Sequence, residues 1–284
     1  MNLPNLSYMM NVGQLRYIQS LCEAAEYRNP DALVGAFLSI RQRLGCILRG
    51  KLFMSRLRAD PFYHYVLART KYYDEVFLDA VKYSVTCIIN IGCGSDTRAY
   101  RFAHVLKQKG ITVLECDQPQ VIHVKQKIAQ RHWSMDHIRY VPLDLNDTRW
   151  TEFVRLLDEK SQGPVLVMME GVSPYISRET FEAFLRLLAT KLHPRSFLAY
   201  DYKIVGAMED VGRSVRAQQL FRLPAERNEV AAYHDALGFQ LQHIELSTEL
   251  SRRLLPGLPL LFDEDCLLRL GPIEHRSGMN RFLS

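Results

Sequence analysis

The feature that most constrains this chain is an apolar strand that runs directly into a two-glycine turn. The run Ile88-Ile89-Asn90-Ile91 meets Gly92-Cys93-Gly94, and a helical pattern follows. Glycines at such a turn let the backbone approach a nucleotide-like cofactor closely. Thr97 stands where a dinucleotide fingerprint has its third glycine, and no Gly-Lys-Ser/Thr follows to cradle phosphates. The turn therefore favours S-adenosylmethionine, a cofactor without phosphates.

Strand and helix patterns alternate after this turn. Apolar strand patterns at 111–116, 138–141, 165–169 and 196–200 are separated by amphipathic helical patterns. The run at 165–169 is apolar throughout, which is typical of a central strand covered on both faces. Such alternation predicts parallel strands joined by right-handed crossovers, and hence a doubly wound α/β sheet.

We expect one domain over residues 1–284, because a chain of this length that is 48% apolar can bury one large core. Residues 1–84 have helical periodicity and many aromatics, which predicts a helical lid and substrate region over the carboxyl ends of the strands. Residues 85–204 form the predicted cofactor-binding core, and 205–225 a second lid element. Residues 226–284 contain two predicted closing strands, at 239–246 and 266–270, antiparallel at one edge.

Cysteine usage and hydropathy indicate a reduced, cytoplasmic setting. The six cysteines show neither a Cys-x-x-Cys pair nor His/Cys metal spacing, so we expect no bound metal. No stretch approaches the ~20 apolar residues that a membrane span needs, and we expect no membrane partner.

The net charge of +5 is modest, but basic residues cluster early in the chain. One interpretation is a solvated helical face, and the other is an electropositive rim that attracts an acidic substrate. No RNA- or DNA-binding motif accompanies the cluster, which argues against nucleic acid as a partner. The cluster consists of Arg41, Arg43, Arg49, Lys51, Arg56 and Arg58.

The carboxyl ends of the first two strands offer the first candidate binding residues, because doubly wound sheets bind ligands there. The first strand ends at Gly92 and Gly94. The second carries Glu115 and Asp117, roughly 20 residues beyond the turn, the spacing at which an acid meets ribose hydroxyls. Asp117 is the preferred ribose ligand of the two.

The third and fourth strand ends add three more candidates. Asp144 can accept a hydrogen bond from an adenine amino group, while Leu145 covers the ring. Glu170 follows five apolar residues, and a buried carboxylate there requires a positively charged partner. A cationic sulfonium or ammonium group would supply that partner.

These residues also carry a family resemblance. The segment Asn90 to Arg101, NIGCGSDTRAYR, resembles the first motif of the leucine carboxyl methyltransferase family, which includes protein phosphatase carboxyl methyltransferases and bacterial natural-product O-methyltransferases. Three more segments agree in order and spacing, and together the four cover about residues 65–205. They are ARTKYYD at 68–74, ECDQP at 115–119 with Lys125, and EGVSPY at 170–175.

The resemblance implies a seven-stranded, Rossmann-like class I methyltransferase fold and a role for each matching residue. Arg69 would hold the methionine carboxylate of the cofactor with its bidentate fork. Glu170 would face the methionine end. Gly92 would contact the cofactor through its backbone, Asp117 would bind the ribose, and Asp144 and Leu145 would bracket the adenine. Cys93 stands where many members have alanine.

The remaining candidate residues are those that could assist the transfer of a methyl group to an acceptor oxygen. A carboxylate acceptor is already ionised, whereas a phenol or an alcohol gains from a general base. His64, His123 and His234 are candidate bases, and His64 is preferred because its aromatic segment lies near the expected lid. Tyr175 is expected to line the substrate pocket.

The sequence therefore predicts an S-adenosylmethionine-dependent O-methyltransferase acting on a carboxylate or hydroxyl of a small secondary metabolite. Methylation of a protein's C-terminal carboxylate is one alternative. A non-catalytic binding module of the same fold is another, although retention of Arg69, Gly92, Asp117 and Glu170 argues against it. The acceptor and the oligomeric state are left open.

Overall fold

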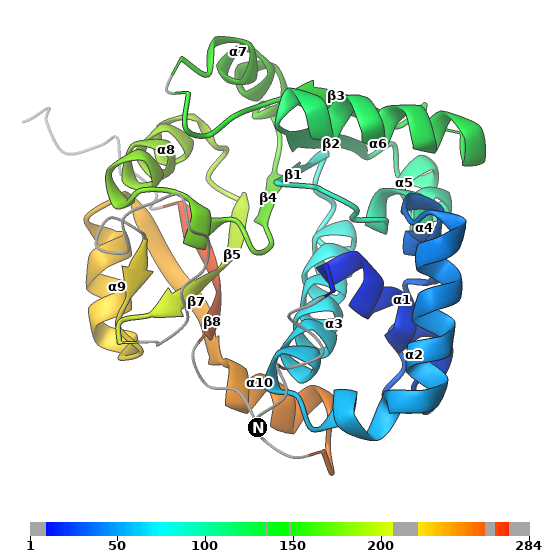
Figure 1. Ribbon diagram of the computed structural model, residues 1–284. Helices are drawn as coiled ribbons and strands as arrows, with labels where there is room; N and C mark the ends of the chain where they lie inside the picture. Colours follow the sequence, from blue (N-terminus) through cyan, green and yellow to red (C-terminus); the bar gives the residue numbers. More distant parts are fainter. Residues whose placement is uncertain (1–9, 135, 148, 207–220, 259–264, 273–284) are drawn as a thin grey trace, which may run out of the picture.

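The protein is described here from a computed structural model that covers residues 10–134, 136–147, 149–206, 221–258 and 265–272 (Figure 1). An eight-stranded sheet forms its centre, with the strand order β3-β2-β1-β4-β5-β8-β7 and with β6 beside β5. The strands are β1 (Cys87–Ile91), β2 (Thr112–Asp117), β3 (Ile138–Pro142), β4 (Val165–Met169), β5 (Phe197–Ile204), β6 (Arg222–Leu223), β7 (Phe239–Leu246) and β8 (Asp265–Pro272).

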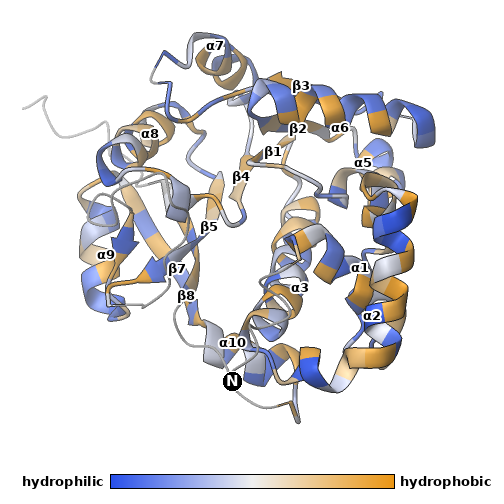
Figure 2. Cartoon of the chain, in the orientation of Figure 1, coloured by the Kyte–Doolittle hydropathy of each residue, from blue (hydrophilic) through white to orange (hydrophobic). Residues whose placement is uncertain are grey.

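The strand pairing confirms the predicted doubly wound sheet. Strands β1 to β5 are parallel, and the chain order reverses between β1 and β4, which pair along their whole length. The two closing strands are antiparallel as expected, with β8 inserted between β5 and β7. Every residue of β1 and β4 is buried, because helices cover both faces of the sheet. Figure 2 shows the corresponding concentration of apolar residues in the central strands.

Connecting helices cover the sheet. They are α4 (Arg98–Arg101), α5 (Ala103–Gln108), α6 (Pro119–His132), α7 (Thr151–Lys160), η3 (Ser173–Tyr175), α8 (Arg178–Lys191), α9 (Arg227–Asp235) and α10 (Ser247–Leu254). Phe153 of α7 and Phe181 of α8 belong to one buried cluster with Val167 of β4. None of the described helices is long and apolar enough to cross a membrane.

The N-terminal region is helical, as predicted, but its longest helix has a different position. The elements are α1 (Val12–Cys22), η2 (Ala32–Phe37), α2 (Ile40–Arg58) and α3 (Pro61–Lys82). Fifteen of the 22 residues of α3 are buried, and the helix packs on the sheet face that includes Ile88, Leu166 and Ala199. Therefore α3 is mainly a layer of the core, and its first turns join α1 and η2 at the ends of the strands.

Helix α1 begins at a reciprocal cap that fixes its first turn. The side chain of Asn11 accepts a hydrogen bond from the Gln14 amide (2.9 Å), and the side chain of Gln14 accepts one from the Asn11 amide (3.1 Å). Figure 1 shows α1 between α3 and α2. Most of the predicted second lid, residues 207–220, lies outside the described residues, and the short strand β6 follows it.

Candidate functional site

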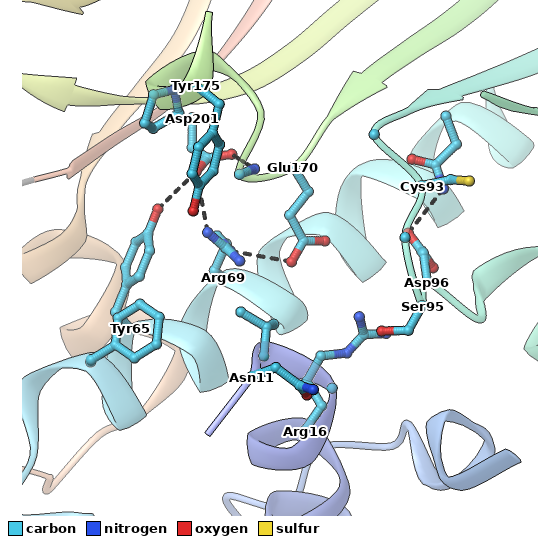
Figure 3. Close-up of a pocket in the computed structure, with 18 of the residues that line it drawn as sticks. Asn11, Arg16, Tyr65, Arg69, Cys93, Ser95, Asp96, Glu170, Tyr175 and Asp201 are labelled. Carbon is cyan, nitrogen blue, oxygen red and sulfur yellow. Dashed lines mark hydrogen bonds and ion pairs between the residues drawn. The ribbon is translucent and has the colours of Figure 1, made fainter. Parts of the chain in front are cut away.

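A cavity of about 360 Å³ opens at the carboxyl ends of β1, β4 and β5 (Figure 3). We call it the main cavity. Its walls combine the glycine turn after β1 with residues from α1, η2 and α3, elements far apart in the sequence. Its lining includes Asn11, Gly13, Arg16, Phe37, Phe62, Tyr65, Arg69, Asn90, Gly92, Gly94, Asp96, Glu170, Tyr175, Asp201, Lys203 and Asp265.

A second cavity of about 200 Å³, the side cavity, adjoins the main one. Asp117, Asp144 and Leu145 line it, and it shares Gly92, Gly171 and Tyr175 with the main cavity. All the cofactor-binding residues predicted from the sequence therefore border these two adjoining spaces: Arg69, Gly92, Gly94 and Glu170 line the main cavity, and Asp117, Asp144 and Leu145 the side cavity.

The glycine turn has a backbone that only glycine adopts easily. Gly92 has φ +68°, and a Cβ atom added to it would lie 2.3 Å from Cγ2 of Val172. Asp117 holds the other side of the turn, because its Oδ2 accepts a hydrogen bond from the Gly94 amide (2.8 Å). The Asp117 Oδ1 accepts another from the Gln118 amide (2.8 Å). The carboxylate that is predicted to bind ribose is thus fixed beside the turn.

Glu115, the weaker ribose candidate, has a structural position instead. It is fully buried, lines neither described cavity and forms an ion pair with buried Lys125. Burial raises the pKa of Glu115 more strongly than Lys125 lowers it. The Lys125 ammonium also donates a hydrogen bond to the Cys93 carbonyl (3.1 Å), so the Glu115–Lys125 ion pair helps to hold the glycine turn in place.

Glu170 is paired, but its partners come from the protein. Its Oε1 lies 3.2 Å from Nε of Arg69, and its Oε2 lies 2.8 Å from Nη1 of Arg98. Burial alone would raise the pKa of Glu170, but Arg98 and Arg69 outweigh it and hold the pKa below its usual range. Arg69 and Arg98 therefore supply the positive partners that a buried carboxylate here requires, and the Glu170 side chain also lines the main cavity, where a cationic ligand would meet it.

Arg69 is held in place from three sides. Besides Glu170, its Nη1 lies 3.4 Å from Oδ2 of Asp201, and its guanidinium lies 5.0 Å from the centre of the Tyr65 ring. Asp201 accepts hydrogen bonds from the Tyr65 hydroxyl (3.0 Å), the Tyr73 hydroxyl (2.9 Å) and the Gly171 amide (2.7 Å). Figure 3 shows Arg69 between Glu170 and Asp201. Asp201 therefore positions both Arg69 and the turn after β4.

Sequence reasoning did not identify Asp201, because the predicted strand ended at Tyr200. The observed strand continues to Ile204, and Asp201 is a fully buried acid within it. The sequence does contain a signal for it. Asp201 lies between Tyr200 and Tyr202 in a buried strand, and a buried acid there requires a polar or charged partner.

Arg98 connects three carboxylates beneath the main cavity. Its side chain is fully buried and contacts Asp74 (2.7 Å), Asp96 (2.6 Å) and Glu170 (2.8 Å). Asp74 also pairs with Arg101 (2.6 Å). The DTR triplet of the first motif, residues 96–98, therefore contributes ion pairs that hold the wall of the main cavity in place.

Arg16 is a second cavity-lining cation that the sequence analysis missed. It is 4% exposed, it forms an ion pair with Asp31, and its Nε atom has no hydrogen-bond partner. Figure 3 shows its side chain directed toward Ser95 and Asp96. Nothing in the local sequence marks this residue, because only the packing of α1 brings it to the glycine turn.

Lys203 and Asp265 form another pair on the cavity wall. They are cross-strand partners in β5 and β8, and the Lys203 ammonium lies 2.9 Å from Oδ2 of Asp265. Burial raises the pKa of Asp265 to about 6 despite the opposing effect of Lys203. The two residues are 62 positions apart, so their pairing depends on a register that local patterns do not reveal.

The candidate bases do not come together at the cavity. His64 is buried on α3, contacts the Arg58 carbonyl and is absent from the lining of both described cavities. Burial lowers the pKa of His234 to about 4, and its ring contacts the Tyr200 hydroxyl (2.5 Å). His123 lies on α6, away from both lining sets. Tyr175, by contrast, is 54% exposed on the shared rim.

The basic cluster is not the rim of the pocket. All six of its residues lie on α2, and none of them lines either cavity as the structure describes them. This outcome agrees with a solvated helical face rather than with an electropositive entrance. Within the described ranges, no group of three His, Cys, Asp or Glu side chains could hold a metal ion.

A parallel sheet with a reversal of strand order and a ligand-sized cavity at that point defines a Rossmann-like α/β protein. Residues 45–189, just over half of the chain, match the leucine carboxyl methyltransferase family. The chain belongs to this family.

Two relatives agree with this assignment. A Mycobacterium avium protein named "Putative S-adenosyl-L-methionine-dependent methyltransferase" is 25% identical over 212 residues, which is 70% of this chain and 66% of that protein, just under two thirds. A protein with the same description from Frankia alni is 27% identical over 229 residues, covering 74% of this chain and 72% of that protein.

The solved structures share the fold at low identity. A DUF574 family protein from Streptomyces avermitilis superposes with a TM-score of 0.57 at 14% identity, covering 92% of this chain and 97% of that one. A structure described as a "putative methyltransferase" from Thermobifida fusca gives a TM-score of 0.53 at 10% identity, covering 93% and 95%. At these identities the likeness concerns the fold alone.

Proposed function

We propose that this protein is an S-adenosylmethionine-dependent O-methyltransferase that acts on a carboxylate or hydroxyl of a small secondary metabolite, such as a polyketide or peptide natural product. One observation carries the proposal: residues from four separate family motifs surround the same two adjoining cavities. Membership in the family and the names of the relatives support methyl transfer as the reaction.

The residues present fit this cofactor. Asp117 accepts one hydrogen bond on each oxygen, so each oxygen keeps a lone pair for a ribose hydroxyl. Asp144 and Leu145 would hold the adenine in the side cavity. Arg69 would bind the methionine carboxylate, and the unpartnered Nε of Arg16 supplies a further donor on the same cavity. Glu170 would accept from the ammonium group.

When bound, S-adenosylmethionine supplies an electrophilic methyl group on a positively charged sulfur. The protein must then align an acceptor oxygen with that methyl group and exclude water. No histidine lines the main cavity as described, and Tyr175 and Phe62 form apolar parts of its wall. This setting favours an acceptor that needs no histidine base, such as a carboxylate, which is ionised at neutral pH.

A small molecule is the first candidate acceptor, because the motifs resemble a family that includes bacterial natural-product O-methyltransferases. The volume of the main cavity, about 360 Å³, falls in the range of small-molecule sites, and the amino-acid end of the cofactor would occupy part of it. Methylation of a protein's C-terminal carboxylate is the second candidate, because the family takes its name from that reaction.

Incubation with methyl-labelled cofactor and an extract of the source organism tests the proposal. We expect label in a small molecule, identified by mass spectrometry, and less label with the Asp117→Ala variant at a cofactor concentration that does not saturate the wild type. Loss of the label on base treatment would identify a methyl ester, whereas a stable product would identify an ether. Label in protein alone would favour the second candidate. Cofactor binding without any transfer would favour a non-catalytic module.

A further inference from the structure

Helix α2 presents a row of large apolar side chains to solvent. Ile40, Leu44, Leu48 and Leu52 are 69%, 63%, 59% and 63% exposed. They are spaced by one helical turn, so they lie along one side of α2 over roughly 18 Å. Single exposed leucines are ordinary, but a continuous row marks a contact surface. We call this row the leucine stripe.

The core does not need the leucine stripe. The buried residues of α2 are Cys46, Gly50 and Leu57, and this opposite side packs on α1. Figure 1 shows α2 on the outer side of α1, away from the sheet. Figure 2 shows apolar and polar residues mixed along its length.

Positive charges flank the leucine stripe without negative ones. Helix α2 contains six Arg or Lys residues and no Asp or Glu. Arg41, Arg49, Lys51 and Arg56 are exposed, and none of them forms an ion pair with another described residue. Among ion pairs between described residues, Arg58 is the one basic residue of this helix that takes part, with Glu23 (2.9 Å). The face therefore offers unbalanced positive charge beside apolar side chains.

We propose that the outer face of α2 binds an anionic lipid surface. Leucine side chains would enter the boundary between headgroups and acyl chains, while the arginines and Lys51 contact lipid phosphates. A second copy of this chain fits less well, because two α2 helices would bring together like charges with no acid between them. The expectation of no membrane partner rested on the lack of a spanning segment, and surface binding needs none.

Vesicle flotation tests this proposal with the full chain. Phosphatidylcholine vesicles with and without phosphatidylglycerol are the probes. We expect the wild type to float with the anionic vesicles and not with the neutral ones. The Arg49→Gln/Lys51→Gln variant should bind anionic vesicles more weakly, by about fivefold per charge. Added salt should weaken binding as well.

The leucines need a matched control. Leu44→Ser/Leu48→Ser should lose at least about tenfold in binding to anionic vesicles. Val124→Ser is the control, because Val124 is 55% exposed on α6 and should leave binding unchanged. Circular dichroism and cofactor affinity confirm that each variant is folded.

Three results would overturn the proposal. The wild type could stay unbound to anionic vesicles, or the serine variant could bind as well as the wild type. Sedimentation could also show a wild-type dimer that Leu44→Ser/Leu48→Ser dissociates, in which case the leucine stripe is an interface between copies. None of these outcomes depends on methyl transfer, so the proposed function is tested separately.

Discussion

Replacing Arg98 by methionine should destabilise the protein strongly, because it removes a buried cation from between three carboxylates. Two of these keep another partner: Asp74 retains Arg101, and Glu170 retains Arg69. Asp96 keeps the hydrogen bonds from the Asn90 amide group (3.1 Å) and from the backbone amide of residue 98 (2.8 Å), but it loses its ion pair. Removing one partner of a buried ion pair costs roughly 3–5 kcal/mol. We expect the free energy of unfolding to fall by about that amount.

Urea denaturation at neutral pH measures this change directly. The control is Arg149→Met, because Arg149 is 86% exposed in its pair with Asp147, and its replacement should change the free energy of unfolding far less. A cost below about 1 kcal/mol for Arg98→Met would refute the idea that this arginine holds the floor of the cavity together.

The pH dependence of the same measurement checks the cause. Burial opposes ionisation of Asp96 and Glu170, but the surrounding cations together outweigh it, and Arg98 contributes most among them. The pKa of each carboxyl therefore lies below its ordinary value, 3.8 for Asp96 and 4.5 for Glu170. The stabilisation is therefore complete above these values and is lost as the pH falls below them. The difference between wild type and Arg98→Met should shrink on acidification. A difference that stays constant would point to packing instead of charge.

Four further predictions concern the cavities. Asp117→Ala should weaken binding of S-adenosylhomocysteine by about 1–3 kcal/mol in calorimetry, and unchanged affinity would remove Asp117 from the site. Arg69→Lys should also weaken binding, since an ammonium cannot reproduce the guanidinium fork, and equal affinity would contradict the clamp. Gly92→Ala should lower the free energy of unfolding by at least about 1 kcal/mol, and adding Val172→Ala should restore only part, because the positive φ remains. The pKa of Asp265 in the folded state is raised to about 6, so the stability that its protonated form contributes is lost as the pH rises through that value. Wild type should lose roughly 1 kcal/mol relative to Asp265→Asn between about pH 5 and 7.5, and parallel stability curves would contradict this.

The sheet could be predicted because its signals are local. Five apolar runs separated by helical patterns predicted the parallel strands. The offset from the glycine turn singled out Asp117, which lines the side cavity. Arg69 depended on the motif resemblance, since nothing in the periodicity of α3 marks it. The packing of most of α3 on the sheet face could not be predicted, because its periodicity does not distinguish a helix over the strand ends from one on the face of the sheet.

The missed residues depend on contacts between distant segments. Arg16 reaches the glycine turn only through the packing of α1, and Lys203 meets Asp265 only through the register of β5 with β8. His64 was preferred for its aromatic neighbours, but adjacency in sequence does not show which side of a helix faces a cavity. Ion pairs between residues far apart in the sequence are therefore the part of a site that local sequence patterns cannot predict.

The central claim is that the two adjoining cavities together hold S-adenosylmethionine. A crystal structure of the protein soaked with S-adenosylhomocysteine tests it most directly. We predict the ribose hydroxyls on Asp117, the adenine beside Asp144 and Leu145, and the amino-acid end in the main cavity near Arg69. Ligand bound elsewhere, or no ligand at saturating concentration, would contradict the account.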